Sequence, residues 1–475
     1  MIRLIEKTYE IAPWYIKNWL MSIAGGIEFY KRYGRYYKQG IAFLRKSQWW
    51  DEGQITAYQL TKLKQLLTIA YTYVPYYREV FDSIGIDLYT IAEATSIEEI
   101  LPKIPFLHKE VLRNNLIKLI NRAPNLKSYA VLYTSGTTGT PIKVIYDRAS
   151  YQIGHFAFLR RFYDWIGLPE CFKSVRFSGR KIVEPERDSP PFWVYDIFNR
   201  RLFMSTYHMN ERNLPYYIEK LNQFKPHLID GYVSAIYILS KFILKHDVKL
   251  EFTPIGIATT AETLYEDQRA TISKAFKCKV FNQYASSEGA PFITECPYGN
   301  LHINFESGIF EFLDIENRPA KPGSIAQMVV TSFRNYKVPL IRYKIGDFVE
   351  LPDTSIKCEC GRVMPVVKRI VGREDDILVA QDGALIGMVS YRVFKDAQHV
   401  KKSQIIQHSI KHIEVKIVKD SNYTVDDENF IRQKLLKIFG ENIAITFNYV
   451  DDIPLERGGK FLSAKRLFSL KEIYS

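Results

Sequence analysis

The fold is decided by one stretch of sequence, Tyr133-Thr134-Ser135-Gly136-Thr137-Thr138-Gly139-Thr140-Pro141, which directly follows a predicted strand at Ala130–Tyr133. Its two glycines let the backbone take positive φ and approach a ligand closely. Its backbone N–H groups and hydroxyl side chains supply a dense set of donors for phosphate oxygens. No lysine follows Gly139, so the stretch is not a P-loop ending in Gly-Lys-Ser/Thr. Composition alone leaves two interpretations open, a phosphate-binding loop and a flexible turn.

On the C-terminal side of this loop, short apolar runs alternate with amphipathic stretches. Strands are predicted at residues 255–259 and 279–284, and helices at residues 214–224, 235–246 and 264–276. This alternation indicates an α/β body. On the N-terminal side, apolar residues at helical spacing predict a helix over residues 55–74, which Pro75 ends.

After Gly372 the pattern becomes that of a small α+β unit. The predicted elements are strands at 403–408 and 413–419, a helix at 426–439 and a strand at 443–450. We therefore expect two domains, a body at 1–372 that begins with a helical, basic arm at 1–80, and a C-terminal domain at 373–475.

Length and composition are those of a globular protein. The chain has 475 residues, of which 47% are hydrophobic and 25% charged. No stretch approaches the roughly 18 apolar residues that a membrane-spanning helix needs. The N-terminus also lacks the pattern of a signal peptide. The five cysteines are odd in number, which disfavours a secreted disulfide framework. We therefore expect a cytoplasmic protein.

The net charge of +13 is concentrated in part in one aromatic-rich segment, residues 31–46. Its basic residues are Lys31, Arg32, Arg35, Lys38, Arg45 and Lys46. Such a segment can lie against an anionic bilayer, here the inner membrane surface. The alternative, which we favour, is a helical arm packed on its own domain with its charges in water. Nucleic acid is not an expected partner, because no nucleic-acid motif accompanies the charge.

The order of residues in the glycine-rich stretch resembles the phosphate-binding signature of the adenylate-forming superfamily, which includes acyl-CoA synthetases, luciferases and adenylation domains. The resemblance implies a large α/β body with a small, mobile C-terminal lid domain. It also implies that ATP phosphates bind to Thr134, Ser135, Gly136, Thr137, Thr138 and Gly139, with Thr138 among the catalytic residues.

Four further segments resemble motifs of that superfamily, in the same order. Residues 284–288, Tyr-Ala-Ser-Ser-Glu, imply that Tyr284 lies near the adenine and the acyl group and that Glu288 holds Mg²⁺. Ala285 stands where the family usually has glycine. In residues 342–347, Arg-Tyr-Lys-Ile-Gly-Asp, the position of Asp347 implies hydrogen bonds to the ribose hydroxyls. An isolated Gly-Asp would by itself indicate a turn.

The remaining two segments resemble the hinge and the catalytic lysine of the superfamily. Residues 372–376, Gly-Arg-Glu-Asp-Asp, imply a nucleotide contact for Arg373 and a hinge at Asp375. Residues 454–461 imply that Lys460 stabilises the charge that develops when a carboxylate attacks the α-phosphate. The alternative is a surface lysine on a glycine-rich turn.

Three features are relevant to the branch of the superfamily: residues 74–78, Val-Pro-Tyr-Tyr-Arg; residues 225–227, Lys-Pro-His, followed by Gly-Tyr-Val-Ser at 231–234 and Thr-Ala-Glu at 260–262; and a set of cysteine and histidine residues. In these the chain resembles the phenylacetate–coenzyme A ligase branch, and its CapK-like capsular-polysaccharide relatives best. This resemblance runs from about Trp50 to Leu467 and less specifically through the first 45 residues. It implies an acyl pocket lined by Tyr232, Ser234, Ala261, Glu262 and Tyr284.

A set of cysteine and histidine residues offers a metal site. It consists of Cys296, His302, Cys358 and Cys360. Three thiolates and one imidazole form a closed tetrahedral set that suits structural Zn²⁺ and leaves no open catalytic position. Some members of the branch carry zinc at matching positions. The alternative is a group of reduced cysteines without metal.

The function that the resemblance implies is ATP-dependent activation of a carboxylic acid to an acyl-adenylate, followed by transfer to a thiol or amine. Coenzyme A, a carrier protein and a sugar amine are the candidate acceptors, and surface-polysaccharide biosynthesis is the expected pathway. Two alternatives remain, a coenzyme A ligase for an aryl acid in catabolism and a non-catalytic nucleotide-binding or membrane-surface assembly protein. The expected cofactors are ATP, Mg²⁺ and structural Zn²⁺.

Overall fold

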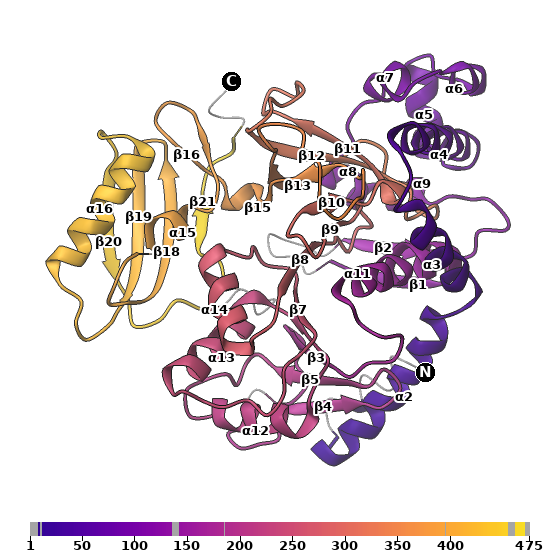
Figure 1. Cartoon of the computed structure of the whole chain (residues 1–475). Helices are drawn as coiled ribbons and strands as arrows, with labels where there is room; N and C mark the ends of the chain where they lie inside the picture. Colours follow the sequence, from indigo (N-terminus) through magenta and orange to yellow (C-terminus); the bar gives the residue numbers. More distant parts are fainter. Residues whose placement is uncertain are drawn as a thin grey trace.

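The computed structural model of the chain describes residues 8–9, 12–134, 142–184, 186–394, 396–454 and 461–470. A nine-stranded sheet forms the middle of the body, in the order β14-β10-β9-β8-β7-β6-β3-β5-β4 (Figure 1). Its strands are β3 Ser174–Ser178, β4 Trp193–Asp196, β5 Arg201–Ser205, β6 Leu228–Gly231, β7 Gly256–Thr259, β8 Val280–Tyr284, β9 Ile293–Glu295, β10 Leu301–Ile303 and β14 Val366–Val367. The five strands from β5 to β8 are parallel to one another, and the strands on both flanks are antiparallel.

Helices cover both faces of the parallel strands, which confirms the α/β body. They are α11 Phe158–Ile166 on one face and α12 Leu214–Phe224, α13 Val233–Lys245 and α14 Glu266–Phe276 on the other. Alternate residues of β3, such as Val175 and Phe177, pack against α12 to α14. Because both faces are covered, the strands are almost wholly buried.

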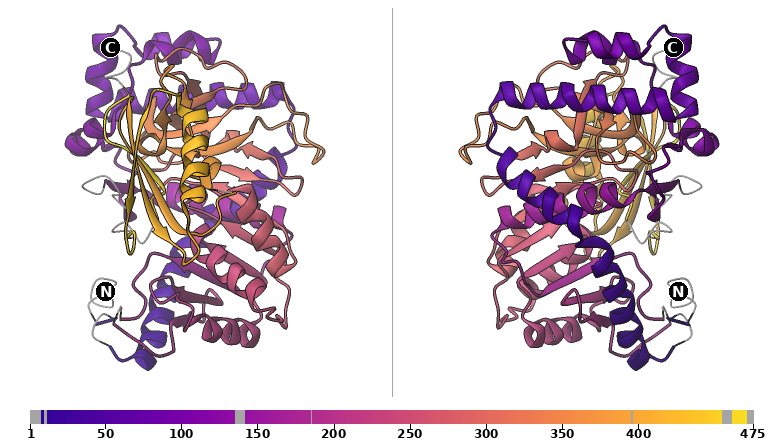
Figure 2. Two further views of the ribbon diagram at one scale, coloured as in Figure 1. Left: turned by 90° about the vertical axis from the view of Figure 1, so that its left-hand side faces the viewer. Right: turned by 90° about the vertical axis from the view of Figure 1, so that its right-hand side faces the viewer.

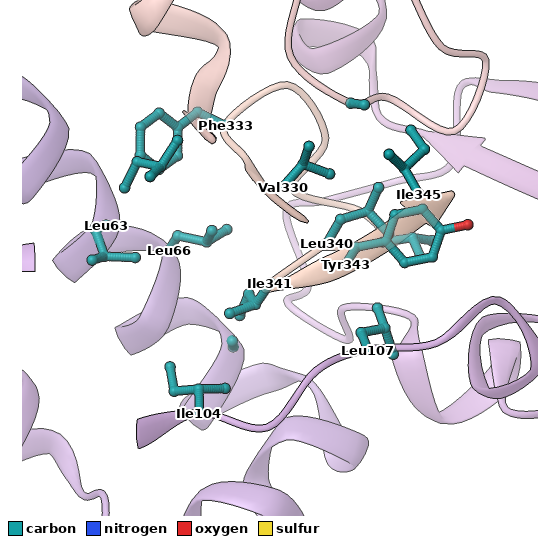
Figure 3. Close-up of a cluster of buried hydrophobic side chains, with 14 of the residues drawn as sticks. Leu63, Leu66, Ile104, Leu107, Val330, Phe333, Leu340, Ile341, Tyr343 and Ile345 are labelled. Atoms are coloured by element: carbon teal, nitrogen blue, oxygen red, sulfur yellow. The ribbon is translucent and has the colours of Figure 1, made fainter. Parts of the chain in front are cut away.

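A second, antiparallel sheet packs against the helices that follow the N-terminal arm. Its order is β11-β12-β13-β15, with bounds Gly308–Leu313, Ile325–Ser332, Tyr343–Glu350 and Arg369–Arg373. The helices are α4 Glu52–Tyr73, α5 Pro75–Ser83, α6 Leu88–Glu93, α7 Ile97–Ile100, η1 Leu101–Lys103, α8 Lys109–Asn114 and α9 Leu116–Leu119, and η3 Phe305–Ser307 precedes β11. Figure 3 shows where they meet: Leu63 and Leu66 of α4 face Val330, Leu340 and Ile341.

The predicted helix at 55–74 is α4, which begins earlier at Glu52. Asp51 caps it, because its carboxylate accepts from the backbone N–H of Gln54 at 2.8 Å while the Gln54 side chain accepts from the N–H of Asp51. The helix predicted to begin at residue 264 begins at Glu266 in α14. The other predicted elements of the body match to within two residues.

The N-terminal arm consists of α2 Trp14–Arg32 and α3 Arg35–Ser47, and it runs along the outside of the body (Figure 2). It contacts a short segment that contains β1 Ala130–Tyr133, β2 Lys143–Tyr146, α10 Arg148–Tyr151 and η2 Gln152–Ala157. Part of the basic charge of this arm is neutralised within the protein, since Arg45 is bound to Asp164 and Glu170. Within the described residues, no helix is both long and apolar enough to cross a membrane.

The C-terminal unit is a four-stranded sheet in the order β20-β19-β18-β21 with a helix packed on it (Figure 1). Its elements are η4 Glu374–Asp376, β16 Leu378–Val379, β17 Leu385–Ile386, α15 Val389–Phe394, β18 Val400–Ser409, β19 His412–Lys419, α16 Val425–Phe439, β20 Ala444–Tyr449 and β21 Ala464–Arg466. The predicted strand–strand–helix–strand order is correct. The short elements β16, β17, α15 and β21 were not predicted, because two to six residues carry too little periodicity. The boundary at residue 372 stays a prediction.

Candidate active site and metal centre

The carboxyl ends of the parallel strands bring the predicted acyl-pocket residues to one edge of the sheet. Tyr232 and Ser234 follow β6, Ala261 and Glu262 follow β7, and Tyr284 ends β8. In open α/β sheets, ligands bind outside this edge. In the sequence these residues belong to separate motifs, and the order of the parallel strands brings them together.

Tyr284, Asp347 and Arg373 meet at the border of the two sheets. The Tyr284 hydroxyl donates a hydrogen bond to Oδ2 of Asp347 at 2.6 Å. Asp347 of β13 lies opposite Arg373 of β15, and Nε of Arg373 is 3.8 Å from Oδ1 of Asp347. Burial raises the pKa of Asp347 above its usual range, although Arg373 opposes this shift. The structure therefore assembles a buried carboxylate with one aromatic and one cationic neighbour from three distant motifs.

Glu288 lies in a tight turn after β8. Ser286 Oγ donates to Oε2 of Glu288 at 2.6 Å and accepts from the Glu288 backbone N–H at 3.0 Å. The next residue, Gly289, has φ +94°, and a Cβ at this position would lie 3.0 Å from the Tyr146 hydroxyl. That hydroxyl donates to the Ser287 carbonyl at 3.0 Å. Tyr146 of β2 therefore fixes the turn that carries Glu288, although no motif had singled Tyr146 out.

The phosphate loop itself falls mostly outside the described residues. The predicted ligands Ser135, Gly136, Thr137, Thr138 and Gly139 lie outside them, as does the predicted catalytic residue Lys460. The base of the loop is described: Thr134 N–H donates to the Ile142 carbonyl at 3.1 Å, and its hydroxyl accepts from Ile142 N–H at 2.9 Å. Thr134 thus closes the β1–β2 hairpin that carries the loop. Asp375 belongs to η4, and its hinge role stays a prediction.

Two of the predicted acyl-pocket residues bind each other. Oε2 of Glu262 accepts from Ser234 N–H at 2.7 Å, and Oε1 accepts from the Ser234 hydroxyl at 3.0 Å. Ala261, beside Glu262, has φ +69°, a left-handed conformation that is unusual for a residue with a Cβ. Strained backbone of this kind concentrates at ligand sites. The lining role of this group stays a prediction.

Three arginines, Arg176, Arg180 and Arg201, lie on or near strands β3 and β5. Arg176 and Arg201 share the buried Asp230, with Nη1 of Arg176 3.2 Å and Nη2 of Arg201 3.7 Å from its Oδ2. Arg180, two residues past β3, forms no ion pair with any described carboxylate. Desolvation lowers its pKa, and Arg176, Arg32 and Arg201 lower it further. An anionic group near the end of β3 would therefore meet an excess of positive charge.

The predicted metal ligands come together from three segments. Cys296 directly follows β9, His302 lies in β10, and Cys358 and Cys360 belong to the loop between β13 and β14. Their four ligand atoms lie within 4.8 Å of one another. Sγ of Cys296 is 3.6 Å from Sγ of Cys358, and Sγ of Cys360 is 3.4 Å from Nε2 of His302. Ligand atoms about 2.3 Å (S) and 2.0 Å (N) from a tetrahedral zinc ion would lie about 3.5–3.8 Å apart, so the donor set fits Zn²⁺.

Neighbouring groups hold this cluster in place. Nδ1 of His302 lies 3.0 Å from the Met364 carbonyl, which turns Nε2 towards Cys360. Nδ2 of Asn300 donates to Sγ of Cys358 at 3.1 Å. His302, Cys296 and Cys358 are all buried. Neither Asn300 nor Met364 was predicted, because no spacing rule identifies the groups that support a metal ligand.

Comparisons with known proteins identify relatives of this chain. The CapK C-terminal domain matches residues 378–466. Protein CapK of Staphylococcus aureus is 33% identical over 96% of this chain and 98% of its own length. A phenylacetate–coenzyme A ligase of Thermus thermophilus is 26% identical over 69% of this chain and 72% of its own length.

Solved structures share the fold at lower identity. A 2-hydroxyisobutyryl-CoA ligase in the postadenylation state matches with a TM-score of 0.67 and 15% identity, over 87% of this chain and 89% of that one. An anthranilate CoA ligase in complex with anthranoyl-AMP has a TM-score of 0.52 and 12% identity, over 77% and 74% of the two chains. From its sequence relatives and its fold together, the chain belongs to the CapK family, within the phenylacetate–coenzyme A ligase branch of the adenylate-forming superfamily.

Proposed function

We propose that this protein uses ATP to convert a carboxylic acid to an acyl-adenylate and then transfers the acyl group to a thiol or amine acceptor. Homology to phenylacetate–coenzyme A ligases and the shared fold support an AMP-forming acid ligase. The observation that carries the proposal is the convergence of Tyr284, Asp347 and Arg373 at the carboxyl edge of the parallel strands. Glu288 belongs to the turn directly after Tyr284.

In the first step, the substrate carboxylate would attack the α-phosphorus of ATP, the bond to the β-phosphate would break, and pyrophosphate would leave. Asp347 would accept hydrogen bonds from the ribose hydroxyls, and Arg373 would hold the nucleotide beside it. Lys460 would oppose the negative charge that develops at the α-phosphate. Positioning and charge neutralisation by these residues would supply most of the rate enhancement.

Glu288 is the residue that would hold Mg²⁺, since a hard cation combines a carboxylate oxygen with phosphate oxygens. The ion would neutralise phosphate charge. The Cys/His cluster would hold Zn²⁺ in a structural role, because four protein ligands leave no position for substrate. Its loops join β9, β10 and β14, so the metal would stabilise that edge of the large sheet.

In the second step, the C-terminal domain would rotate about Asp375, withdraw Lys460 and admit the acceptor. Coenzyme A, a carrier-protein thiol and a sugar amine are the candidate acceptors. The relationship to protein CapK favours an acyl group destined for a surface polysaccharide. An enzyme of that pathway would act in the cytoplasm or at the inner membrane surface.

The test is ATP–pyrophosphate exchange with Mg²⁺ and without acceptor, across a panel of aryl, fatty, amino and sugar acids. Exchange with one class establishes adenylation and names the acid. A preference for simple aryl acids together with efficient use of coenzyme A would favour the catabolic alternative.

Two further measurements separate a wrong panel from an inactive protein. ATP binding to the wild type that is lost in Asp347→Ala shows that the nucleotide site works, and the panel is then extended. Undetectable ATP binding to the wild type would contradict the proposal. ATP binding with no exchange for any acid, even in the extended panel, would favour the non-catalytic nucleotide-binding alternative.

A further inference from the structure

Helix α2 presents an apolar, aromatic face to the outside of the molecule. Trp19 and Tyr30 are 74% and 76% exposed. The exposed large apolar residues of this helix are Trp14, Tyr15, Ile16, Trp19, Ile23, Phe29 and Tyr30. Tyr15, Trp19, Ile23 and Tyr30 are four or seven residues apart, so they lie on one side of the helix. A helix that faces water normally shows polar residues there.

The polar residues of α2 point inward instead. Lys17 is 2% exposed and forms an ion pair with Glu184. Asn18 and Ser22 bind the edge strand β4: Oδ1 of Asn18 accepts from the Tyr195 N–H at 2.8 Å, and the Ser22 hydroxyl donates to the Tyr195 carbonyl at 3.3 Å. These side chains satisfy backbone groups that an edge strand leaves unpaired.

Close packing fixes α2 in this orientation. A Cβ on Gly25 would lie 2.2 Å from Oδ2 of Asp196, and a Cβ on Gly26 would lie 3.0 Å from the Phe198 ring. Any larger residue at Gly25 would therefore clash with the Asp196 carboxylate, and either that side chain or the helix would have to move. Phe198 and Ile197, in the turn after β4, are themselves 50% and 60% exposed. Phe198 lies against Gly26 of α2, so Phe198 and Ile197 extend the apolar face of the helix into one patch at the edge of the body.

Basic residues flank this patch. Arg35 and Lys38 follow in α3, and Arg200 follows Phe198. All three are exposed, and none forms an ion pair with a described residue. Acidic side chains are scarce beside them, because Asp196 is buried and Glu28 is occupied by Lys31, Arg32 and the Tyr151 hydroxyl. The end of the patch next to Tyr30 and Phe198 is therefore cationic.

This combination of side chains matches one kind of partner, an anionic lipid surface. Tryptophan and tyrosine prefer the boundary between headgroups and acyl chains, and basic residues nearby attract anionic headgroups. The inward Lys17 and the attachment to β4 prevent α2 from entering the bilayer end on. An interfacial helix instead lies in the plane of the membrane with its apolar face down.

We propose that the outer face of α2, together with Ile197 and Phe198, docks on an anionic bilayer with the helix parallel to the membrane. This surface differs from the basic segment 31–46 taken alone, because apolar side chains supply the contact and only part of the basic segment assists. The proposal does not depend on catalysis, so failure of the acid-activation proposal would leave it standing.

The test is cosedimentation of the full-length protein with vesicles of phosphatidylcholine, with and without about one third phosphatidylglycerol. We expect binding to the anionic vesicles that weakens as salt is added. The triple variant Trp19→Ser, Ile23→Ser, Tyr30→Ser should bind at least about tenfold more weakly. The variant Arg35→Gln, Lys38→Gln, Arg200→Gln should lose a similar amount on anionic vesicles and most of the salt dependence.

A matched control replaces three exposed apolar residues elsewhere, as Tyr89→Ser, Ile117→Ser and Tyr298→Ser. This control should bind vesicles like the wild type, and all variants should keep the wild-type circular dichroism spectrum and melting temperature. Where the α2 triple variant is less stable, Trp19→Ser alone provides the milder test.

Unchanged sedimentation of the α2 variants would overturn the proposal, as would equal loss in the matched control. Absence of wild-type binding to the anionic vesicles would overturn it too. In that last case, a concentration-dependent dimer that the α2 triple variant abolishes would show that a second copy of the chain covers this face.

Discussion

The metal cluster and the nucleotide site differ in how much of each lies within one rigid part of the molecule. The four metal ligands lie just after β9, in β10 and in one loop of the body, and their ligand atoms lie within 4.8 Å of one another. The proposed nucleotide site combines Tyr284 and Asp347 of the body with Arg373 next to the C-terminal unit, and it would also use Lys460, which lies outside the described residues. A structural site gains from being preformed, whereas a ligase must open to bind and release its ligands. Substitutions in the two sites should therefore damage different properties.

The largest effect is expected from Cys358→Ser, in the metal cluster. Loss of a thiolate from a buried tetrahedral site should abolish zinc binding and lower the free energy of unfolding by about 3–5 kcal/mol. Metal analysis of the purified protein and thermal melting with and without a chelator measure this effect. The control is Cys171→Ser, because Cys171 is exposed and outside the cluster. Equal melting temperatures for both variants would exclude a structural metal.

Lys460→Ala should affect catalysis and leave stability unchanged. Removal of a charge that acts mainly on the transition state should slow ATP–pyrophosphate exchange about 10²–10³-fold, with ATP still bound. The matched variant is Lys465→Ala, an exposed lysine of β21. Full exchange activity in Lys460→Ala would remove Lys460 from the mechanism.

Asp347→Asn should change stability and ATP binding in different directions. Loss of a charged acceptor for the ribose should weaken ATP binding about 10–100-fold. Because burial raises the pKa of Asp347, its ionisation disfavours the ligand-free fold as pH rises through that pKa. The ligand-free variant should therefore melt at the same or a higher temperature than the wild type at pH 7. This advantage should disappear below about pH 4, where the wild-type carboxyl is protonated in both states. Calorimetry at both pH values and ATP titration measure the two effects.

Tyr284→Phe should have the smallest effect. The substitution keeps the ring and removes one hydrogen bond to Asp347. A hydrogen bond of this kind contributes about 1 kcal/mol, so we expect ATP affinity to fall about fivefold. ATP titration of this variant in the Asp347→Asn background gives a double-mutant cycle. Additive effects of the two substitutions would show that the 2.6 Å contact does not contribute to binding.

The sequence predicted the fold class and several of the longer elements, because their signals are local and long. Helix α4 and the strand–strand–helix–strand order of the C-terminal unit follow from apolar periodicity. Short elements such as β21 were not predicted, because their partner strands lie far away in the sequence. Strand β21 pairs with β18, about sixty residues earlier. For the site, motif order identified Tyr284, Asp347 and Arg373, but no local signal pointed to Tyr146, which fixes the turn of Glu288.

The sequence by itself determined which chemical groups are available. It supplied a hydroxyl-rich glycine loop, three thiols and an imidazole, and acidic residues at the ends of apolar runs, since these depend only on residue type and spacing. The tertiary structure alone decided which of these groups meet and which surfaces remain open. The packing of the two sheets placed Asp347 against Tyr284, and the attachment of α2 to β4 through Asn18 and Ser22 turned its aromatic face outward. Contacts between the sheets and close packing at Gly25 determine these outcomes, and neither leaves a local pattern in the chain.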